Sequence, residues 1–300
     1  MTTRNPGLSG WLVIDKPEGI TSAGVVARVK RASGAKVGHA GTLDPLATGV
    51  LPLALGEATK TVQCLARGRK HYRFRVRWGV ATDTDDRAGA IVAESAARPT
   101  ADEIRAALAA FTGTILQLPP LYSAIKQGGR RAYALARAGR PPRLDARPVE
   151  IFDLRLSSVA DPDHAEFAAI VGEGTYIRAL ARDLAQTLGT CAHVVELRRL
   201  AVGRFTEEQA ISLECAVALG HSLAASEYLL PLETALDDIP ALAVTAEEAV
   251  RLCHGQRVAP ACRDDGIADG ALVGLWHARR VVALARVEAG ILRPVRVILA

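Results

Sequence analysis

The sequence predicts an α+β protein with a mixed, largely antiparallel central sheet flanked by helices, an inserted basic arm and a small C-terminal β-barrel. Three observations favour this fold class. Segments with strand periodicity alternate irregularly with helical segments, unlike the regular βα repeat of a parallel sheet. Residues 128–147 are rich in Gly and Arg and lack the large apolar side chains of a core. Residues 269–300 read as short strands separated by turn residues, which suits a small barrel.

The first elements follow from short, clear signals. Trp11–Asp15 is an apolar run that ends in a Lys-Pro-Glu-Gly turn, which predicts a buried strand. Thr21 is placed to cap a helix that extends to about Ala32 and stops at Gly34. We expect a loop over residues 38–52 that runs into an apolar strand, Val50–Leu55, and then a helix over Glu57–Arg67.

The next segment has the clearest period-two pattern in the chain. Apolar and aromatic residues alternate with basic ones, so the segment predicts a strand with one apolar and one basic face. The apolar face holds Tyr72, Phe74, Val76 and Trp78, and the other holds His71, Arg73, Arg75 and Arg77.

The remaining elements are assigned in the same way. We expect strands at 90–93, 148–158, 164–171 and 193–205, a helix at 101–110, and a second helix opened by Thr175 and closed by Gly189. The arm covers residues 124–147, with Gly128 and Gly129 as its hinge. The segment 236–249 marks a boundary between two domains, 1–236 and 241–300.

Bulk composition excludes several classes of protein. The chain has 300 residues, of which 49% are hydrophobic and 23% charged, as in ordinary globular domains. No stretch approaches the roughly 20 apolar residues of a membrane span, and the apolar run after the N-terminus is too short for a signal peptide. The five cysteines are widely spaced without a C-x-x-C pair, which favours a reducing, cytoplasmic location over a disulfide framework or zinc site.

Positive charge is concentrated in two segments. The net charge is +5, yet residues 61–80 carry six basic residues, Arg67 among them, and no acid. Residues 121–147 carry seven basic residues against one acid, Asp145. Two basic segments on a mildly acidic body predict a polyanionic partner, although the alternative of a solvated surface stays open.

The stretch GHAGTLDPLATGVLP, residues 38–52, contains a single acid, Asp44. One interpretation is structural: Asp44 caps a helical turn that begins at Pro45. Motifs for other chemistry are missing from the sequence, including phosphate-binding loops, H-E-x-x-H and G-x-S-x-G. Asp83, Asp85 and Asp86 could be a magnesium site, but three acids in a turn more often form the turn itself.

Several blocks, in order, resemble the TruB type of tRNA pseudouridine synthase. Residues 38–52 are similar to the catalytic loop of that family, with Asp44 in the place of its nucleophile. The other blocks are DKPEGITS (15–22), KHYRF (70–74), TDTDDRAG (82–89), LYSAIKQGG (121–129), GTYIRALARDLA (174–185) and LRRLAVGRF (197–205). The tail resembles the PUA domain often appended to such enzymes. The resemblance covers nearly the whole chain.

The resemblance implies a cofactor-free and metal-free enzyme that isomerises the uridine at position 55 in the T-loop of tRNA. Asp44 would be the nucleophile, with Arg178 beside it, and the uridine would be flipped out of its stack. Tyr72 would stack on the uracil, Tyr176 and Leu197 would bound the pocket, His39 would contact displaced nucleotides, and Lys16 would support the loop. The basic residues that would hold the phosphates of the T-arm are Lys126, Arg130, Arg131, Arg137 and Arg140.

Alternatives to these roles stay open. Arg178 could be a phosphate contact, Tyr72 a core residue and His39 structural. The whole chain could be a non-catalytic tRNA-binding or tRNA-folding protein, or an N-glycosidase that releases uracil. A pure binder would not require Asp44, Arg178 and Tyr72 together. We expect a cytoplasmic monomer.

Overall fold

The structure is a computed structural model that describes residues 8–66, 68–140, 142–259 and 266–298. Arg67 and Cys262 therefore lie outside the described residues. The chain forms two compact units. The central unit consists of Asp44–Gly49 and Arg69–Val202, and the terminal unit contains Val50–Gly68 and the segments that end at Leu43 and begin at Gly203. The division between residues 236 and 241 stays a prediction.

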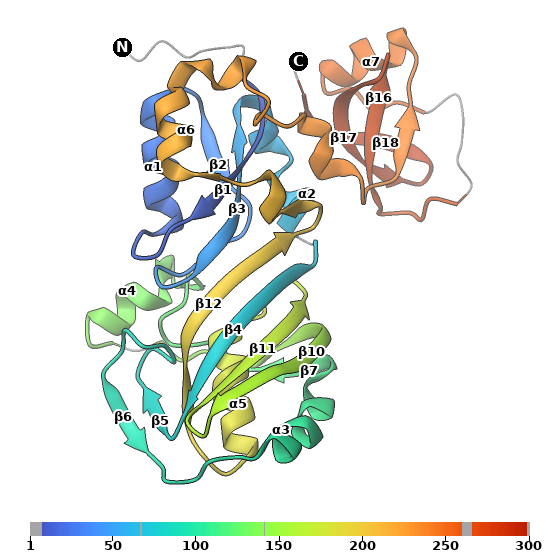
Figure 1. Cartoon of the computed structure of the whole chain (residues 1–300). Helices are drawn as coiled ribbons and strands as arrows, with labels where there is room; N and C mark the ends of the chain where they lie inside the picture. The colour runs from blue at the N-terminus through green and yellow to red at the C-terminus, as the bar shows by residue number, and fades with distance from the viewer. Residues whose placement is uncertain (1–7, 67, 141, 260–265, 299–300) are drawn as a thin grey trace. The chain divides into compact units, whose positions relative to one another are not determined.

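The central unit is built on an antiparallel sheet with helices packed against it (Figure 1). Each strand is antiparallel to its neighbours. The order is β12 (Ala192–Val202), β4 (Lys70–Trp78), β11 (His164–Val171), β10 (Arg147–Asp161) and β7 (Gly113–Gln117). At the start of β3 (Thr48–Leu55), Thr48 and Gly49 pair in parallel with β12. Gly49 has φ +98°, and a Cβ there would lie 2.2 Å from the backbone oxygen of Arg199, so only glycine allows this approach.

Strand β4 confirms the predicted alternation. Its apolar side chains are buried, and the rings of Phe74 and Phe167 stack with their centroids 5.3 Å apart. On the other face Arg73 and Arg77 are exposed, whereas an Arg75 nitrogen lies 3.4 Å from a carboxylate oxygen of Glu196 on β12. The segment itself has no acid, but its neighbour strand supplies one.

Two helices pack on this sheet, α3 (Ala101–Leu108) and α5 (Ile177–Thr187). The prediction that Thr175 opens the second helix is wrong, because α5 begins two residues later, with Tyr176 at the N-cap position. The side chain of Gln117 explains the shift. Its amide accepts from the backbone N–H of Tyr176 at 2.8 Å and donates to the Tyr176 carbonyl at 3.2 Å, which fixes the chain there from β7.

The predicted arm folds into a hairpin and a short helix. Strands β8 (Lys126–Gln127) and β9 (Arg130–Arg131) pair antiparallel, and α4 (Ala132–Arg137) follows. Gly128 and Gly129 have φ +57° and +80° and form the two-residue turn of this hairpin. Another hairpin, β5 (Val80–Thr82) with β6 (Ile91–Glu94), frames the turn that contains Asp83, Asp85 and Asp86.

The terminal unit contains β1 (Gly10–Lys16), with α1 (Ser22–Ser33) and α6 (Leu213–Leu219) side by side (Figure 1). The caps of α1 are as predicted: Thr21 accepts from the N–H of Gly24 at 3.0 Å, and Gly34 ends the helix with φ +67°. The loop predicted for residues 38–52 is shorter than expected, because β2 (Val37–His39) pairs with β3. Glu57–Arg67 is not one helix, since Thr61 bonds back to Ala58 and separates two short ones. These are η1 (Gly56–Lys60) and α2 (Val62–Ala66).

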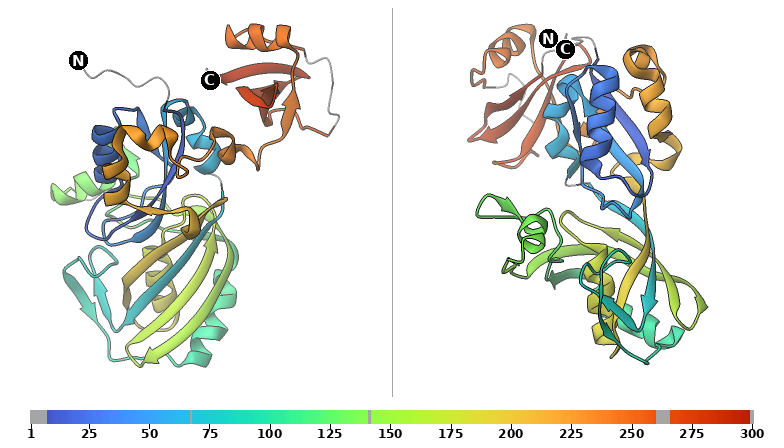
Figure 2. Two further views of the ribbon diagram at one scale, coloured as in Figure 1. Left: turned by 45° about the horizontal axis from the view of Figure 1, so that its top comes forward. Right: turned by 90° about the vertical axis from the view of Figure 1, so that its left-hand side faces the viewer.

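The C-terminal part has a four-stranded sheet with its own apolar core. Its order is β15 (Ala241–Ala243), β16 (Leu272–His277), β17 (Arg280–Glu288) and β18 (Ile291–Val297). Helix α7 (Ala246–Cys253) packs on β17 and β18 (Figure 2). Within the described residues no strand pairing closes this sheet into a barrel. The remaining short elements come before this sheet in the sequence, in both units. They are η2 (Ala109–Phe111), β13 (Phe205–Thr206), η3 (Glu207–Gln209), β14 (Ile211–Ser212), η4 (Gly220–Ala225) and η5 (Leu232–Leu236).

Candidate functional site

Asp44 lies in an irregular turn rather than at a helix start. The N–H of Ala47 donates to the backbone carbonyl of Asp44 at 3.1 Å, and no helix follows. The residue before it, Leu43, is held at both backbone groups by the hydroxyl of Ser22, at 2.8 and 3.0 Å. The capping interpretation of Asp44 is wrong, because its carboxylate is used elsewhere.

That carboxylate is bound by Arg178 at the start of α5. The Nε of Arg178 donates to Oδ2 of Asp44 at 2.9 Å. The Arg178 side chain is 3% exposed and that of Asp44 is 31% exposed, so one partner is buried and the other borders solvent. A charge-assisted hydrogen bond from a guanidinium fixes the direction of this carboxylate.

The rest of the Arg178 guanidinium is also occupied. Nη1 donates to the carbonyl of Thr84 at 2.6 Å, and Nη2 donates to that of Tyr122 at 2.9 Å. Nη1 also lies 3.7 Å from Oδ2 of Asp86, whose other oxygen accepts from the Thr84 hydroxyl at 2.6 Å. One arginine therefore joins the Asp44 turn, the 82–89 turn and the segment before the arm.

Sequence reasoning missed the part played by the 82–89 turn. Asp86 is buried and faces Arg178, so the interpretation of the acids as simple turn formers is incomplete. Thr84 and Tyr122 contribute backbone carbonyls, which the side-chain pattern does not reveal. The available signal was the pair of arginines four residues apart in RALAR, which lie on one face of a helix and require acceptors.

Three of the predicted pocket residues belong to the same unit as Asp44. Tyr72 and Leu197 are buried, at 8% and 7% exposure, on neighbouring strands of the sheet. Tyr176 immediately precedes α5 and is partly buried, with the guanidinium carbon of Arg147 5.5 Å from its ring centroid. Their roles toward a substrate stay predictions.

Lys16 and His39 belong to the terminal unit. The ammonium of Lys16 is fully buried and donates to the carbonyls of Pro17 and Ile20 at 2.9 and 2.8 Å. This geometry supports the 17–20 turn. His39 is partly buried at the end of β2. Substrate contacts of both residues stay predictions.

Five of the seven basic side chains of the arm are those predicted to bind phosphates. All five are exposed, and none makes an ion pair with another residue that the structure describes: Lys126, Arg130, Arg131, Arg137 and Arg140. The other basic segment differs, because Lys70 is buried. Burial lowers the pKa of Lys70 to about 8, against the opposing effect of Glu173.

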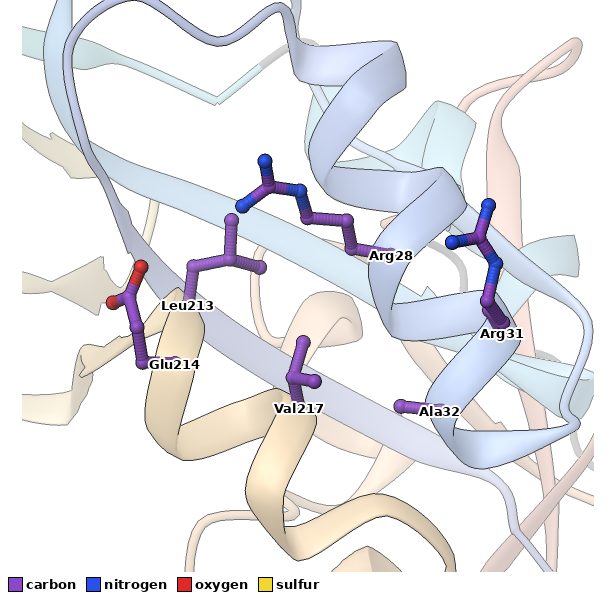
Figure 3. A pocket seen from close by; sticks show the side chains of 6 residues that line it. All are labelled: Arg28, Arg31, Ala32, Leu213, Glu214 and Val217. Atoms are coloured by element: carbon purple, nitrogen blue, oxygen red, sulfur yellow. The ribbon is translucent and has the colours of Figure 1, made fainter.

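A separate groove of about 360 Å³ lies between α1 and α6 in the terminal unit (Figure 3). Arg28, Arg31 and Ala32 line it from α1, and Leu213, Glu214 and Val217 line it from α6. It contains no carboxylate–arginine pair within the described residues. No group of three potential metal ligands occurs anywhere in that described part of the chain, and none of its helices could span a bilayer.

Comparison with known proteins decides the family. The model of the TruB family pseudouridylate synthase N-terminal domain matches residues 28–177, and that of the tRNA pseudouridylate synthase B C-terminal domain matches residues 178–237. A protein named tRNA pseudouridine synthase B from Rhodospirillum rubrum is 52% identical over 98% of both chains. One of the same name from Caulobacter vibrioides is 50% identical over 99% of both.

The chain belongs to the TruB family of pseudouridine synthases. It is therefore an isomerase, as the resemblance of its sequence blocks implied. The fold is similar to that of an archaeal box H/ACA sRNP Nop10-Cbf5 complex, with TM-score 0.74 and 27% identity over 97% of this chain and 86% of that one. A Cbf5-Nop10-Gar1 complex gives TM-score 0.73 and 30% identity over 93% and 78%. These likenesses confirm a mixed α+β fold of the TruB type.

Replacing Arg178 with Met should destabilise the protein. The substitution keeps an unbranched side chain but leaves the Thr84 and Tyr122 carbonyls without their donor and Asp86 without a facing charge. Breaking a buried pair costs several kcal/mol, and we expect a loss of about 3 kcal/mol because Asp44 borders solvent. Urea unfolding at pH 7 measures it, with Arg155→Met, from an exposed pair with Asp153, as the matched control. Equal effects of the two substitutions would contradict this account.

Proposed function

We propose that the chain isomerises the uridine at position 55 in the T-loop of tRNA, with Asp44 as nucleophile and without a metal or cofactor. The observation that carries the proposal is the buried Arg178 guanidinium, bonded to a carboxylate that itself borders solvent. The relatives named tRNA pseudouridine synthase B support tRNA as the substrate. A related H/ACA RNP bound to a substrate RNA, with TM-score 0.74 and 25% identity, supports an RNA-binding face.

The chemistry requires one ionised carboxylate. Pseudouridine forms when the N1–C1′ bond of uridine breaks, the uracil turns, and a new bond joins C1′ to C5. C5 then loses its proton to solvent and N1 gains one, so the product is an isomer of uridine. A carboxylate attacks C1′ or stabilises positive charge there, as a glycosidase nucleophile does. Uracil leaves as a stabilised anion, so a second acid is not needed to protonate it. Arg178 orients the carboxylate of Asp44 through its hydrogen bond.

The uridine must leave its stack before Asp44 reaches C1′. We assign Tyr72 to stacking on the flipped uracil and Tyr176 and Leu197 to the pocket wall. His39 contacts displaced nucleotides of the T-loop, and Lys16 supports the 17–20 turn of the protein. Arg147 already lies near the Tyr176 ring, which suits a ring that bounds the pocket rather than one that stacks on the base.

The phosphates of the T-arm bind the arm of the protein. Lys126, Arg130, Arg131, Arg137 and Arg140 are exposed and form no ion pair within the described residues, so their charge is available to phosphates. We assign the C-terminal sheet to a PUA-like RNA-binding domain over residues 241–300, which follows a catalytic domain over residues 1–236. The protein acts as a cytoplasmic monomer.

A non-catalytic tRNA-binding role is the second candidate, and the exposed arm favours it. The buried arginine–carboxylate network speaks against it, because phosphate binding does not require a guanidinium whose donors are used internally. An N-glycosidase would share the first step. Unchanged RNA mass after reaction distinguishes isomerisation from loss of uracil.

Asp44→Asn should abolish turnover and leave RNA affinity nearly unchanged. The substitution keeps the size of the side chain and removes the nucleophilic charge, and loss of a negative charge does not weaken binding to a polyanion. Tritium release from 5-³H-uridine in a T-arm transcript measures turnover, since only substitution at C5 frees the label. Asp153→Asn, which removes an exposed carboxylate from the same unit, is the control. Wild-type release by Asp44→Asn would remove Asp44 from this role.

Tyr72→Ala should lower the rate of the chemical step more than it weakens ground-state binding. Stacking of a base on an aromatic ring is worth roughly 1–3 kcal/mol, or about five- to over a hundredfold in rate. Single-turnover kinetics measures the step, and Tyr72→Phe separates the ring from its hydroxyl. If Tyr72→Ala reacts as fast as wild type while folded, Tyr72 is a core residue only.

Replacing Arg130, Arg131, Arg137 and Arg140 with Gln should weaken binding rather than chemistry. Up to about four phosphate contacts are lost, so the slope of log affinity against log salt should fall by roughly 0.9 per contact. Turnover at saturating RNA should recover, because Asp44 and Tyr72 are untouched. An unchanged slope would place phosphate recognition elsewhere, with Arg73 and Arg77 on β4 as the next candidates.

A further inference from the structure

A second arginine of α5 holds the same two segments as Arg178. Arg182 lies four residues further along the helix, on the same face. Its Nη1 donates to Oδ2 of Asp85 at 3.0 Å, and its Nη2 donates to the carbonyl of Leu118 at 2.7 Å. Arg178 binds the same two segments at neighbouring residues. It donates to the carbonyl of Thr84, one residue before Asp85, and to the carbonyl of Tyr122, four residues after Leu118.

Asp85 is held in an unusual backbone conformation. Its φ is +58°, in the left-handed region that few residues other than glycine adopt. Its carbonyl accepts from the N–H of Val194 on β12 at 3.1 Å, and its carboxylate points to Arg182. Asp85 therefore sets the direction of the chain between Thr84, which bonds Arg178, and Asp86, which faces it.

We infer that Arg182 and Asp85 are positioning residues for the isomerisation: they lock the 82–89 turn and the segment at Leu118 so that Arg178 holds Asp44 in its reactive direction. The inference rests on the proposed role of Asp44. Neither residue touches Asp44 in the described structure, so the pair acts only through Arg178. Arg182 is itself oriented by Asp183, which accepts from its Nε at 2.9 Å.

The burial of Asp85 bears on whether its ionised form stabilises the fold. Burial raises the pKa of Asp85, although Arg182 and Arg178 oppose the shift and Asp183 adds to it. A raised pKa means that folding disfavours the ionised form, so the ionised Asp85 costs stability at neutral pH. The pair also has a geometric effect, because Arg182 links Asp85 to the segment at Leu118.

The first test is kinetic. Arg182→Ala should lower kcat for tritium release by about tenfold or more, with the KM for a T-arm transcript nearly unchanged, because small misplacements of a reacting group are costly. Arg155→Ala, from the exposed pair with Asp153, is the matched control and should match wild type. Arg182→Lys keeps the charge but loses the planar fork whose two Nη atoms bind Asp85 and Leu118, so it should restore little of the rate.

The second test uses Asp85→Asn, which tolerates the left-handed backbone and lacks the charge. We expect a lower kcat but no loss of unfolding free energy at pH 7. In wild type, kcat should fall on the acid side as Asp85 protonates, at a higher pH than for an ordinary carboxyl. In Asp85→Asn this fall should move to lower pH, because the nucleophilic carboxylate must still be ionised. Relative to Asp85→Asn, wild type should lose stability as pH rises through the pKa of Asp85.

The outcomes are distinct. Wild-type kcat in folded Arg182→Ala, or an unchanged acid limb in Asp85→Asn, overturns the positioning role. A loss of stability in Asp85→Asn that matches its loss of kcat makes the pair structural, which also overturns it. Asp44→Asn is assayed alongside. If that variant is active, the proposed function fails; if it is inactive while Arg182→Ala is normal, only the present inference fails.

Discussion

The site depends on one buried guanidinium. Arg178 uses all three of its nitrogens, on a carboxylate of one segment and on backbone carbonyls of two others. These acceptors lie 134, 94 and 56 residues from Arg178 in sequence. They have no regular secondary structure where they meet Arg178. A planar fork of fixed geometry is what allows one side chain to bind three such acceptors together. A lysine at this position would supply the charge without the directions.

The desolvation of that guanidinium explains the acids around it. A buried charge is tolerated only when it is paired and hydrogen-bonded. Asp44 and Asp86 face Arg178, and Asp85 and Asp183 contact Arg182. The two arginines are thus outnumbered by carboxylates, which leaves Asp44 in competition with Asp86 for the same cation. Asp44 is the more exposed of these two, at 31% against 10% for Asp86, which agrees with its proposed role as nucleophile.

The sequence predicted much of this arrangement, and its failures have physical causes. The period-two pattern of β4 and the caps of α1 are local signals, and the structure confirms both. Resemblance paired Asp44 with Arg178, and the structure shows their bond. The roles of Thr84 and Tyr122 could not be predicted, because backbone carbonyls carry no sequence signal. The start of α5 was misplaced for a related reason: the side chain that fixes it, Gln117, comes from β7, 59 residues away.

The two basic segments also look different in sequence and in structure. Their net charges in the sequence are similar, but the structure shows that their cations are not equally exposed. In β4, Lys70 is buried and Arg75 lies 3.4 Å from Glu196, so part of that positive charge is not available to a partner. In the arm, five basic side chains are exposed and form no ion pair within the described residues, whereas Arg147 is partly buried and lies over the Tyr176 ring. Counterion release depends on the cations that reach phosphates and not on the net charge of a chain. Arginines therefore fall into two groups here. Those of α5 bind carboxylates of the protein, whereas the exposed ones of the arm have no acidic partner within the described residues and are the ones proposed to bind phosphates.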